Sequence, residues 1–126
     1  MLDPVRTVSI FQKQPGQLNI SAGEVIFEDG KIGDVMYGII EGEVELFVNG
    51  QVVETIKKGD IFGAGALVHK VHTRASTAMA KVDSKLAYLD EERFLFVVQE
   101  TPMFALDVIR SYSDRLRRLK RSVNID

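Results

Sequence analysis

The sequence contains no cysteine and no tryptophan, and it has no long hydrophobic run. Without cysteine the chain can form neither disulfides nor thiolate metal sites, and thiol catalysis is excluded. An apolar stretch of about 18 residues, the least that suggests a membrane-spanning helix, is also missing, and we expect no membrane insertion. Residues 1–16 lack the basic start and apolar core of a secretory signal, so we expect a cytoplasmic protein.

An excess of charge of either sign is also absent. The 126 residues carry 16 Lys and Arg against 18 Asp and Glu, and the net charge of −2 gives no overall attraction to polyanions. Hydrophobic residues make up 45% and charged residues 27% of the chain, as in folded globular domains and unlike disordered segments. At this length we expect a single domain over residues 1–126.

Glycine is missing after residue 65. All 10 glycines lie between Gly16 and Gly65, which predicts two structural regimes. In the first regime, glycines recur at intervals of eight or nine residues, the spacing of turns in a compact β domain. These glycines are Gly33, Gly42, Gly50 and Gly59.

Alternating polar and apolar residues predict strands between these turns. In residues 43–46 the alternation places Val44 and Leu46 on a buried face. Asn49 and Gly50 separate two apolar runs and predict a type I′ hairpin turn, because both residues adopt positive φ readily. Further strands are predicted over residues 24–27, 36–40, 52–56, 60–62, 75–82 and 85–89.

After the last predicted strand, the hydrophobic period becomes that of helices. Asp90 is a favourable N-cap, and the two glutamates after it suit the positive end of a helix dipole. A second helix is predicted to have Thr101 as N-cap and Pro102 as its first residue, and to run to about Arg121.

The second helix carries apolar residues at alternating intervals of four and three positions. They form a seam of Ala105, Ile109, Tyr112, Leu116, Leu119 and Val123. Such a seam can pack on the β domain, pair with the same helix of a second chain, or do both along different parts of its length. The seam is too short for the sequence to distinguish the two, so a homodimer through Ile109, Tyr112, Leu116 and Leu119 stays open.

A short run of small residues is the candidate ligand site. Residues 62–67 read Phe-Gly-Ala-Gly-Ala-Leu, and they place nearly bare backbone amides at the start of a single helical turn. Arg74 begins the following strand, and its guanidinium can form paired hydrogen bonds with a phosphate or carboxylate. A Gly/Ala bend where strands cross closely, beside a solvated surface arginine, explains the same residues without a ligand.

These residues resemble the cyclic-nucleotide-binding domains of catabolite activator protein, of cAMP-dependent protein kinase regulatory subunits and of cyclic-nucleotide-gated channels. Residues 33–44 and 59–63 are similar to the family's glycine-punctuated β-roll motif. Residues 62–67, followed by Arg74, Ala75 and Ser76, are similar to its phosphate-binding cassette. The closing segment, with Phe94, Pro102 and residues 114–117, is similar to its last two helices.

The resemblance covers nearly the whole chain and implies an α+β fold. In that fold, a jelly-roll-like β barrel of about eight short strands, the family's β roll, occupies about residues 20–90. N-terminal turns precede the roll, and two C-terminal helices follow it over about residues 91–121. In the family, ligand bound at the cassette repositions these helices, with Tyr112 or Leu116 as candidates to cover a base.

The resemblance also implies the binding residues. Arg74 pairs with the cyclic phosphate, and backbone amides of the cassette assist. The positions carried over are Gly63, Ala64, Gly65, Ala66, Leu67, Arg74, Ala75 and Ser76. At position 64 the family has a glutamate that accepts a hydrogen bond from the ribose 2′-hydroxyl, and the methyl group of Ala64 accepts none.

The sequence therefore predicts non-catalytic sensing of a cyclic nucleotide, cAMP or cGMP, or of another small anion, with weakened or altered ribose recognition. The alternative is a ligand-free protein-interaction or dimerisation module on the same fold. No nucleophile triad, phosphate loop or dinucleotide motif occurs, so we expect no enzyme.

The remaining polar clusters have ordinary explanations. His69 and His72 are expected to be solvent-exposed loop residues, because zinc needs three or four protein ligands, and no metal or other cofactor is predicted. Basic residues crowd positions 110–121, where Asp107 and Asp114 stand at helical pairing distance. The family's transcription factors carry a helix-turn-helix after the long helix, and this sequence ends at Asp126, so we expect no DNA binding by the chain itself.

Overall fold

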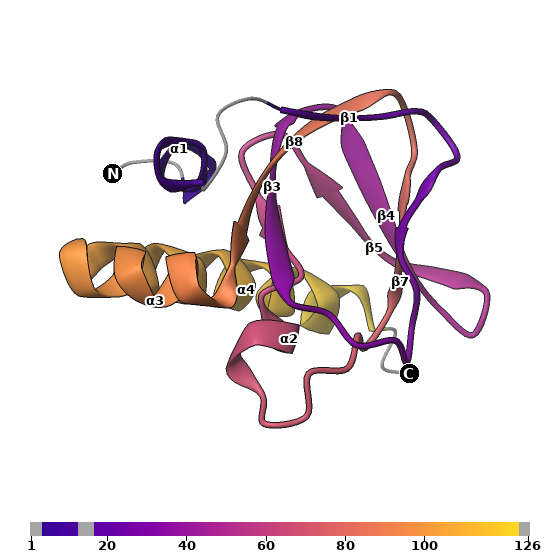
Figure 1. Cartoon of the computed structure of the whole chain (residues 1–126). Coiled ribbons are helices and arrows are strands. Elements are labelled where there is room, and N and C mark those ends of the chain that lie inside the picture. The colour runs from indigo at the N-terminus through magenta and orange to yellow at the C-terminus, as the bar shows by residue number, and fades with distance from the viewer. Residues whose placement is uncertain (1–3, 13–16, 124–126) are drawn as a thin grey trace.

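Eight strands form two four-stranded antiparallel sheets in the computed structural model, which describes residues 4–12 and 17–123. The first sheet has the order β1 (Leu18–Ile20), β8 (Ser84–Asp90), β3 (Val35–Glu41) and β6 (Ile61–Phe62). The second has the order β2 (Val25–Phe27), β7 (Thr77–Ala80), β4 (Glu43–Val48) and β5 (Gln51–Lys57). The helices are α1 (Pro4–Phe11), α2 (Gly65–Val68), α3 (Glu91–Glu100) and α4 (Met103–Ser122). The predicted α+β fold, a β roll with two C-terminal helices, is confirmed (Figure 1).

Strand β3 lies between two hydrophobic cores, because successive side chains of a strand point to opposite faces. On one face, Met36 packs with Val97 of α3 and Phe104 of α4 in the helix-side core. On the other, Ile39 packs with Phe62 and residues of β4, β5 and β7 inside the roll. In Figure 1, α1 and α3 lie to one side of the roll, and α4 continues beneath it.

The hairpin between β4 and β5 has the predicted turn. Asn49 has φ 52° and Gly50 has φ 78°, so both central residues have the positive φ of a type I′ turn. Val48 and Gln51 are the last paired residues before it. The register set by the turn shifts by one residue between Phe47 and Leu46, so that Glu54, which lines the site described below, pairs with Leu46.

The N-terminal region and one strand differ from the prediction. An eight-residue helix, α1, replaces the expected N-terminal turns and buries Val5 and Val8. Helices this short are marginal on their own and depend on tertiary packing, so local sequence signals do not reveal them. Strand β7 covers four residues of the predicted 75–82, because residues 74–76 bend around the pocket described below. Gly16 lies outside the described residues.

The ends of the two C-terminal helices match the prediction closely. The Arg93 N–H donates to the Asp90 carboxylate (2.8 Å), so Asp90 caps α3 as predicted. Helix α4 begins at Met103, one residue later than predicted, although Pro102 already has helical dihedrals. The Thr101 N–H donates to the Val97 carbonyl and closes α3. Among the described residues, no helix combines the length and hydrophobicity needed to cross a membrane.

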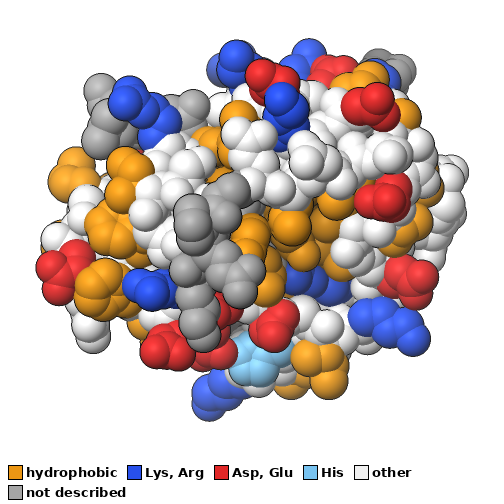
Figure 2. All heavy atoms as spheres, turned by 45° about the horizontal axis from the view of Figure 1, so that its top comes forward, with side chains coloured by type: hydrophobic (Ala, Val, Ile, Leu, Met, Phe, Trp, Pro, Cys, Tyr) orange, Lys and Arg blue, Asp and Glu red, His pale blue; other side chains and the backbone are white. Residues whose placement is uncertain are grey.

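The face of α4 that packs on the rest of the molecule is not the predicted seam. Its buried residues are Phe104, Asp107, Val108, Ser111 and Arg115. Ile109 and Leu116 of the seam are 63% and 52% exposed, whereas Tyr112 packs against the helix-side core, so only part of the seam packs on the rest of this chain. Polar residues occupy part of the buried face because they have partners on the roll: Ser111 bonds Asp60, and Arg115 bonds Glu54. Figure 2, which brings the top of Figure 1 forward, shows hydrophobic side chains at the surface on the left, the side where Figure 1 places α1 and α3.

Candidate ligand-binding site

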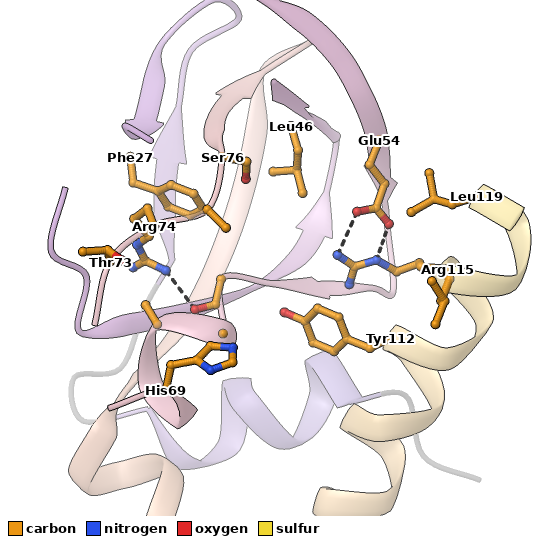
Figure 3. Close-up of a pocket in the computed structure, with 15 residues that line it drawn as sticks. Phe27, Leu46, Glu54, His69, Thr73, Arg74, Ser76, Tyr112, Arg115 and Leu119 are labelled. Carbon is orange, nitrogen blue, oxygen red and sulfur yellow. Dashed lines mark hydrogen bonds and ion pairs between the residues drawn. The ribbon is translucent and has the colours of Figure 1, made fainter. Parts of the chain in front are cut away.

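A pocket of about 430 Å³ lies between the cassette residues, the interior of the roll and α4 (Figure 3). This volume lies in the range of small-molecule sites. Six of the predicted site residues line it: Gly63, Gly65, Ala66, Arg74, Ala75 and Ser76. The structure thus brings together the two cassette segments, which are separated in sequence by the loop that carries the histidines.

Ala64 and Leu67 do not line this pocket. Both side chains are buried in the helix-side core, below the cassette turn. The Ala64 backbone N–H donates to the hydroxyl of Tyr112 (3.1 Å), which ties α4 to the cassette. The amide of Ala64 therefore already has a partner on α4.

Arg74 is buried against the cassette, with 5% of its surface exposed. Its Nη1 donates to the Gly63 carbonyl (2.8 Å), and its Nη2 donates to the Val35 carbonyl (2.6 Å). The guanidinium carbon lies 4.1 Å from the centroid of the Phe27 ring, a cation–π distance. Its Nε is buried and has no hydrogen-bond partner. The alternative of a solvated surface arginine does not fit this burial.

Gly33 makes room for the Arg74 side chain. A Cβ atom at position 33 would overlap the Nε and guanidinium carbon of Arg74. The same segment is fixed to the loop before the arginine, because the Gly33 N–H donates to the His72 carbonyl (2.7 Å). The Arg74 N–H donates to the Lys31 carbonyl (2.8 Å) in turn. A glycine of the β-roll motif thus positions the arginine.

The charge of Arg74 is poorly compensated within the protein. Burial lowers the pKa of Arg74, and the more distant Tyr37, Asp34 and Tyr112 oppose this only in part. Arg74 forms no ion pair with any of the described residues. Burying a cation without a counter-charge is costly, so this arrangement favours an anion in the pocket.

Arg115 provides the contrast on the other side of the pocket. Its Nε lies 2.6 Å from Glu54 Oε2, its Nη2 lies 3.3 Å from Glu54 Oε1, and its Nη1 donates to the Ile61 carbonyl. Burial lowers the pKa of Arg115, but the hydrogen bond to Glu54 and the nearby Tyr112, Glu54 and Asp60 outweigh it and raise the pKa above its usual value. The charge of Arg115 is therefore compensated within the protein, by the carboxylate of Glu54.

Apart from Tyr112 and Leu116, the sequence did not point to the contributions of the roll and α4. The pocket is also lined by Phe27, Leu46, Glu54, His69, Thr73, Tyr112, Arg115, Leu116 and Leu119. Tyr112 and Leu116 were candidates to cover a base, and both lie in this lining. Arg115 was grouped with the surface charges of α4, although it follows Phe104, Val108 and Ser111 on one helical face. That spacing was the available signal.

One of the two loop histidines is not the exposed residue predicted. His72 is half-buried, and its Nδ1 lies 2.6 Å from the Ala66 carbonyl, a geometry that needs a proton on Nδ1. His69 is exposed at the edge of the pocket. Within residues 4–12 and 17–123, no cluster of three or more His, Asp or Glu side chains is placed to hold a metal ion.

Comparisons with known proteins agree with this fold. A region of 74 residues is 43% identical to the cAMP-dependent protein kinase regulatory subunit of Schizosaccharomyces pombe, and it covers 58% of this chain and 18% of that protein. A region of 83 residues is 34% identical to the cGMP-dependent protein kinase of Plasmodium berghei, covering 66% of this chain and 10% of that protein. The chain thus spans less than a fifth of the length of these curated relatives.

The crystal structure of catabolite activator protein from Thermus thermophilus superposes with a TM-score of 0.74 at 25% identity, over 94% of this chain and 55% of that one. Residues 17–101 match the sequence profile of the cyclic nucleotide-binding domain, which includes all eight strands and the cassette. A match over this share of the chain establishes its membership: the chain belongs to the cyclic nucleotide-binding domain family.

Proposed function

We propose that the chain binds a cyclic nucleotide, cAMP or cGMP, in the pocket beside Arg74 and acts as a non-catalytic sensing domain. The observation that carries this proposal is the buried, uncompensated guanidinium of Arg74 with its unpartnered Nε. The cassette residues Gly65, Ala66, Ala75 and Ser76 lie in the same lining. A cyclic phosphate diester carries one negative charge, which matches the single charge of this arginine.

Ribose recognition is expected to be weak in this domain. Ala64 has no side-chain acceptor, and its methyl group packs in the helix-side core. A hydrogen bond to a charged group contributes about 1.5–3 kcal/mol, so its loss weakens binding by about 10–150-fold. The proposal is therefore a cyclic-nucleotide sensor of reduced affinity or altered nucleotide preference.

Helix α4 is the element through which binding would reach the rest of the molecule. The cassette contacts α4 through Ala64 and Tyr112, and the roll contacts it through Glu54 and Arg115. A ligand that binds more tightly to one placement of α4 shifts the population toward that placement. In this proposal, ligand binding is sensed as a change in the position of α4 on the roll.

Isothermal titration of the purified chain with cAMP, cGMP and 5′-AMP tests the proposal. We expect saturable binding of at least one cyclic nucleotide and at least about tenfold weaker binding of 5′-AMP, whose phosphate is a dianionic monoester attached only at the 5′ position. Inorganic phosphate serves as the control for an anion site without nucleotide preference. The absence of binding of both cyclic nucleotides at millimolar concentration would contradict the proposal.

A second candidate function is self-association through α4. The observation in its favour is that Ile109 and Leu116 of the seam are largely exposed in the single chain. A second chain that packed on α4 would cover them. We expect Ile109→Lys to convert a dimer to a monomer in multi-angle light scattering, because it places a charge in the proposed interface. Ile109 is chosen because it lies outside the pocket lining. Val53→Lys, at an exposed apolar position of β5, is the matched control. A wild-type chain that is monomeric at about 100 μM would exclude stable self-association.

A further inference from the structure

The pocket lining contains charged groups other than Arg74, the ion pair of Glu54 and Arg115. Figure 3 shows Arg74 beside Phe27 on one side and the Glu54–Arg115 pair on the other, with Leu46 between them and Tyr112 along α4. Glu54 comes from β5 and Arg115 from α4, so neither belongs to the cassette. A ligand that fills the pocket has an anionic end at Arg74 and a second end that meets a carboxylate.

We propose that Glu54, oriented by Arg115, accepts a hydrogen bond from an N–H group of the nucleotide base, so that the pocket prefers amino-substituted purine cyclic nucleotides over purines that lack the amino group. This inference rests on the proposed function and assigns the base end of the same site. It makes Glu54 a specificity residue and Arg115 a positioning residue.

The Glu54 carboxylate has acceptor capacity left after pairing. Two of its roughly four lone-pair directions are used by Nε and Nη2 of Arg115, at 2.6 Å and 3.3 Å. The Glu54 side chain is 17% exposed and lines the pocket, whereas the Arg115 side chain is 5% exposed. The arginine is therefore committed to the protein, and the carboxylate keeps acceptor capacity within the pocket lining.

The order of groups along a cyclic nucleotide matches the order of groups along the pocket. The ribose is fused to the cyclic phosphate, so it lies next to the guanidinium that binds the phosphate. The base lies farther from Arg74 than the ribose does, and Leu46, Tyr112 and Leu116 of the lining suit the faces of a purine ring. Glu54 is the carboxylate within this lining, and an amino group on the purine edge is the donor that it can accept.

The ion pair also fastens α4 to the roll, and a test has to separate the two roles. Asp60 provides the matched control, because it too contacts α4, through Ser111 (3.1 Å) and Arg118 (4.0 Å), but does not line the pocket. Asp60→Asn weakens the attachment of α4 without changing the carboxylate in the cavity. A purely structural role of Glu54 predicts the same binding behaviour in both variants.

The experiment measures the affinities of wild type, Glu54→Gln and Asp60→Asn for cAMP, 2′-deoxy-cAMP and the cyclic monophosphate of purine riboside, which lacks the amino group. We expect the wild type to bind cAMP about tenfold or more tightly than the deamino analogue, as for one hydrogen bond to a charged group. This preference falls to about threefold or less in Glu54→Gln and is retained in Asp60→Asn. If Glu54→Gln does not fold, the double variant Glu54→Leu/Arg115→Met replaces both charges by apolar groups and gives the same readout.

Three results would overturn the inference while leaving the proposed function intact. In the first, the wild type binds cAMP and the deamino analogue equally. In the second, the preference persists in both Glu54 variants or is lost equally in Asp60→Asn. In the third, the 2′-deoxy analogue shows the penalty that Glu54→Gln removes, which would assign Glu54 to the ribose. Failure of the wild type to bind any of the three nucleotides or cGMP would overturn both proposals.

Discussion

Replacing Arg74 by glutamine is expected to lower the affinity for cAMP at least about 100-fold and to leave the stability of the unliganded domain nearly unchanged. The affinity loss follows from removing a charged fork that can form two hydrogen bonds with the phosphate, each contributing about 1.5–3 kcal/mol. Isothermal titration of the variant beside the wild type measures it. A large loss of affinity together with a small change in stability would show that Arg74 serves ligand binding rather than folding.

The small stability change is the result of two opposing effects. The variant loses the hydrogen bonds from Arg74 to the carbonyls of Gly63 and Val35, at about 1–3 kcal/mol for each acceptor left unsatisfied. It also removes a buried, uncompensated cation, whose desolvation disfavours the folded state by several kcal/mol. We expect the net change in the free energy of unfolding to lie within about 2 kcal/mol of zero, measured by urea denaturation.

Arg110→Gln is the control for this variant. Arg110 is on α4, pairs with Asp107 at 3.3 Å and is partly exposed outside the pocket lining, so its loss should change neither binding nor stability by much. If Arg74→Gln bound cAMP within about threefold of the wild type, the phosphate would not lie at Arg74, and the proposed function would be wrong.

Phe104→Ala is expected to produce the largest loss of stability among single substitutions in α4, about 3–5 kcal/mol. The Phe104 side chain is fully buried, at 0% exposure, and its ring contacts Phe94 edge to face with centroids 5.8 Å apart. The cavity would open in the helix-side core, which also contains Met36 and Val97. Since domains are stable by about 5–15 kcal/mol, a large share of the total would be lost.

Met103→Ala is the matched control, because Met103 precedes Phe104 in the first turn of α4 and is 54% exposed. Equilibrium denaturation in urea compares the two variants with the wild type. We expect Met103→Ala to change the free energy of unfolding by less than about 1 kcal/mol. Equal effects of the two substitutions would mean that α4 does not use the Phe104 face to pack on the roll.

The parts of the fold that were predictable depend on short stretches of chain. The Asn49–Gly50 turn, the Asp90 cap and the alternation of β4 are set by residues within a few positions of one another. The cassette run and Arg74 were also visible, because a motif in a fixed order points to one local geometry. These local signals did not predict the burial of Arg74 or its hydrogen-bond partners.

The face of α4 was not predictable for a geometric reason. Adjacent helical residues differ by about 100° around the axis, so a shift of one position turns the helix from one face to the next. Apolar residues favoured the seam through Ile109 and Leu116, while the buried face carries Ser111 and Arg115. Their partners, Asp60 and Glu54, are 51 and 61 positions away in sequence, and no local pattern encodes such pairs.

The sequence by itself determined the family, the β roll with its two closing helices, and the cassette with Arg74. Only the tertiary structure decided the state of the charges in the pocket. It buries Arg74 without an ion-pair partner among the described residues and gives Arg115 the carboxylate of Glu54. The physical reason is that local conformation follows from neighbouring residues, whereas the cost of a buried charge depends on every group the fold brings around it.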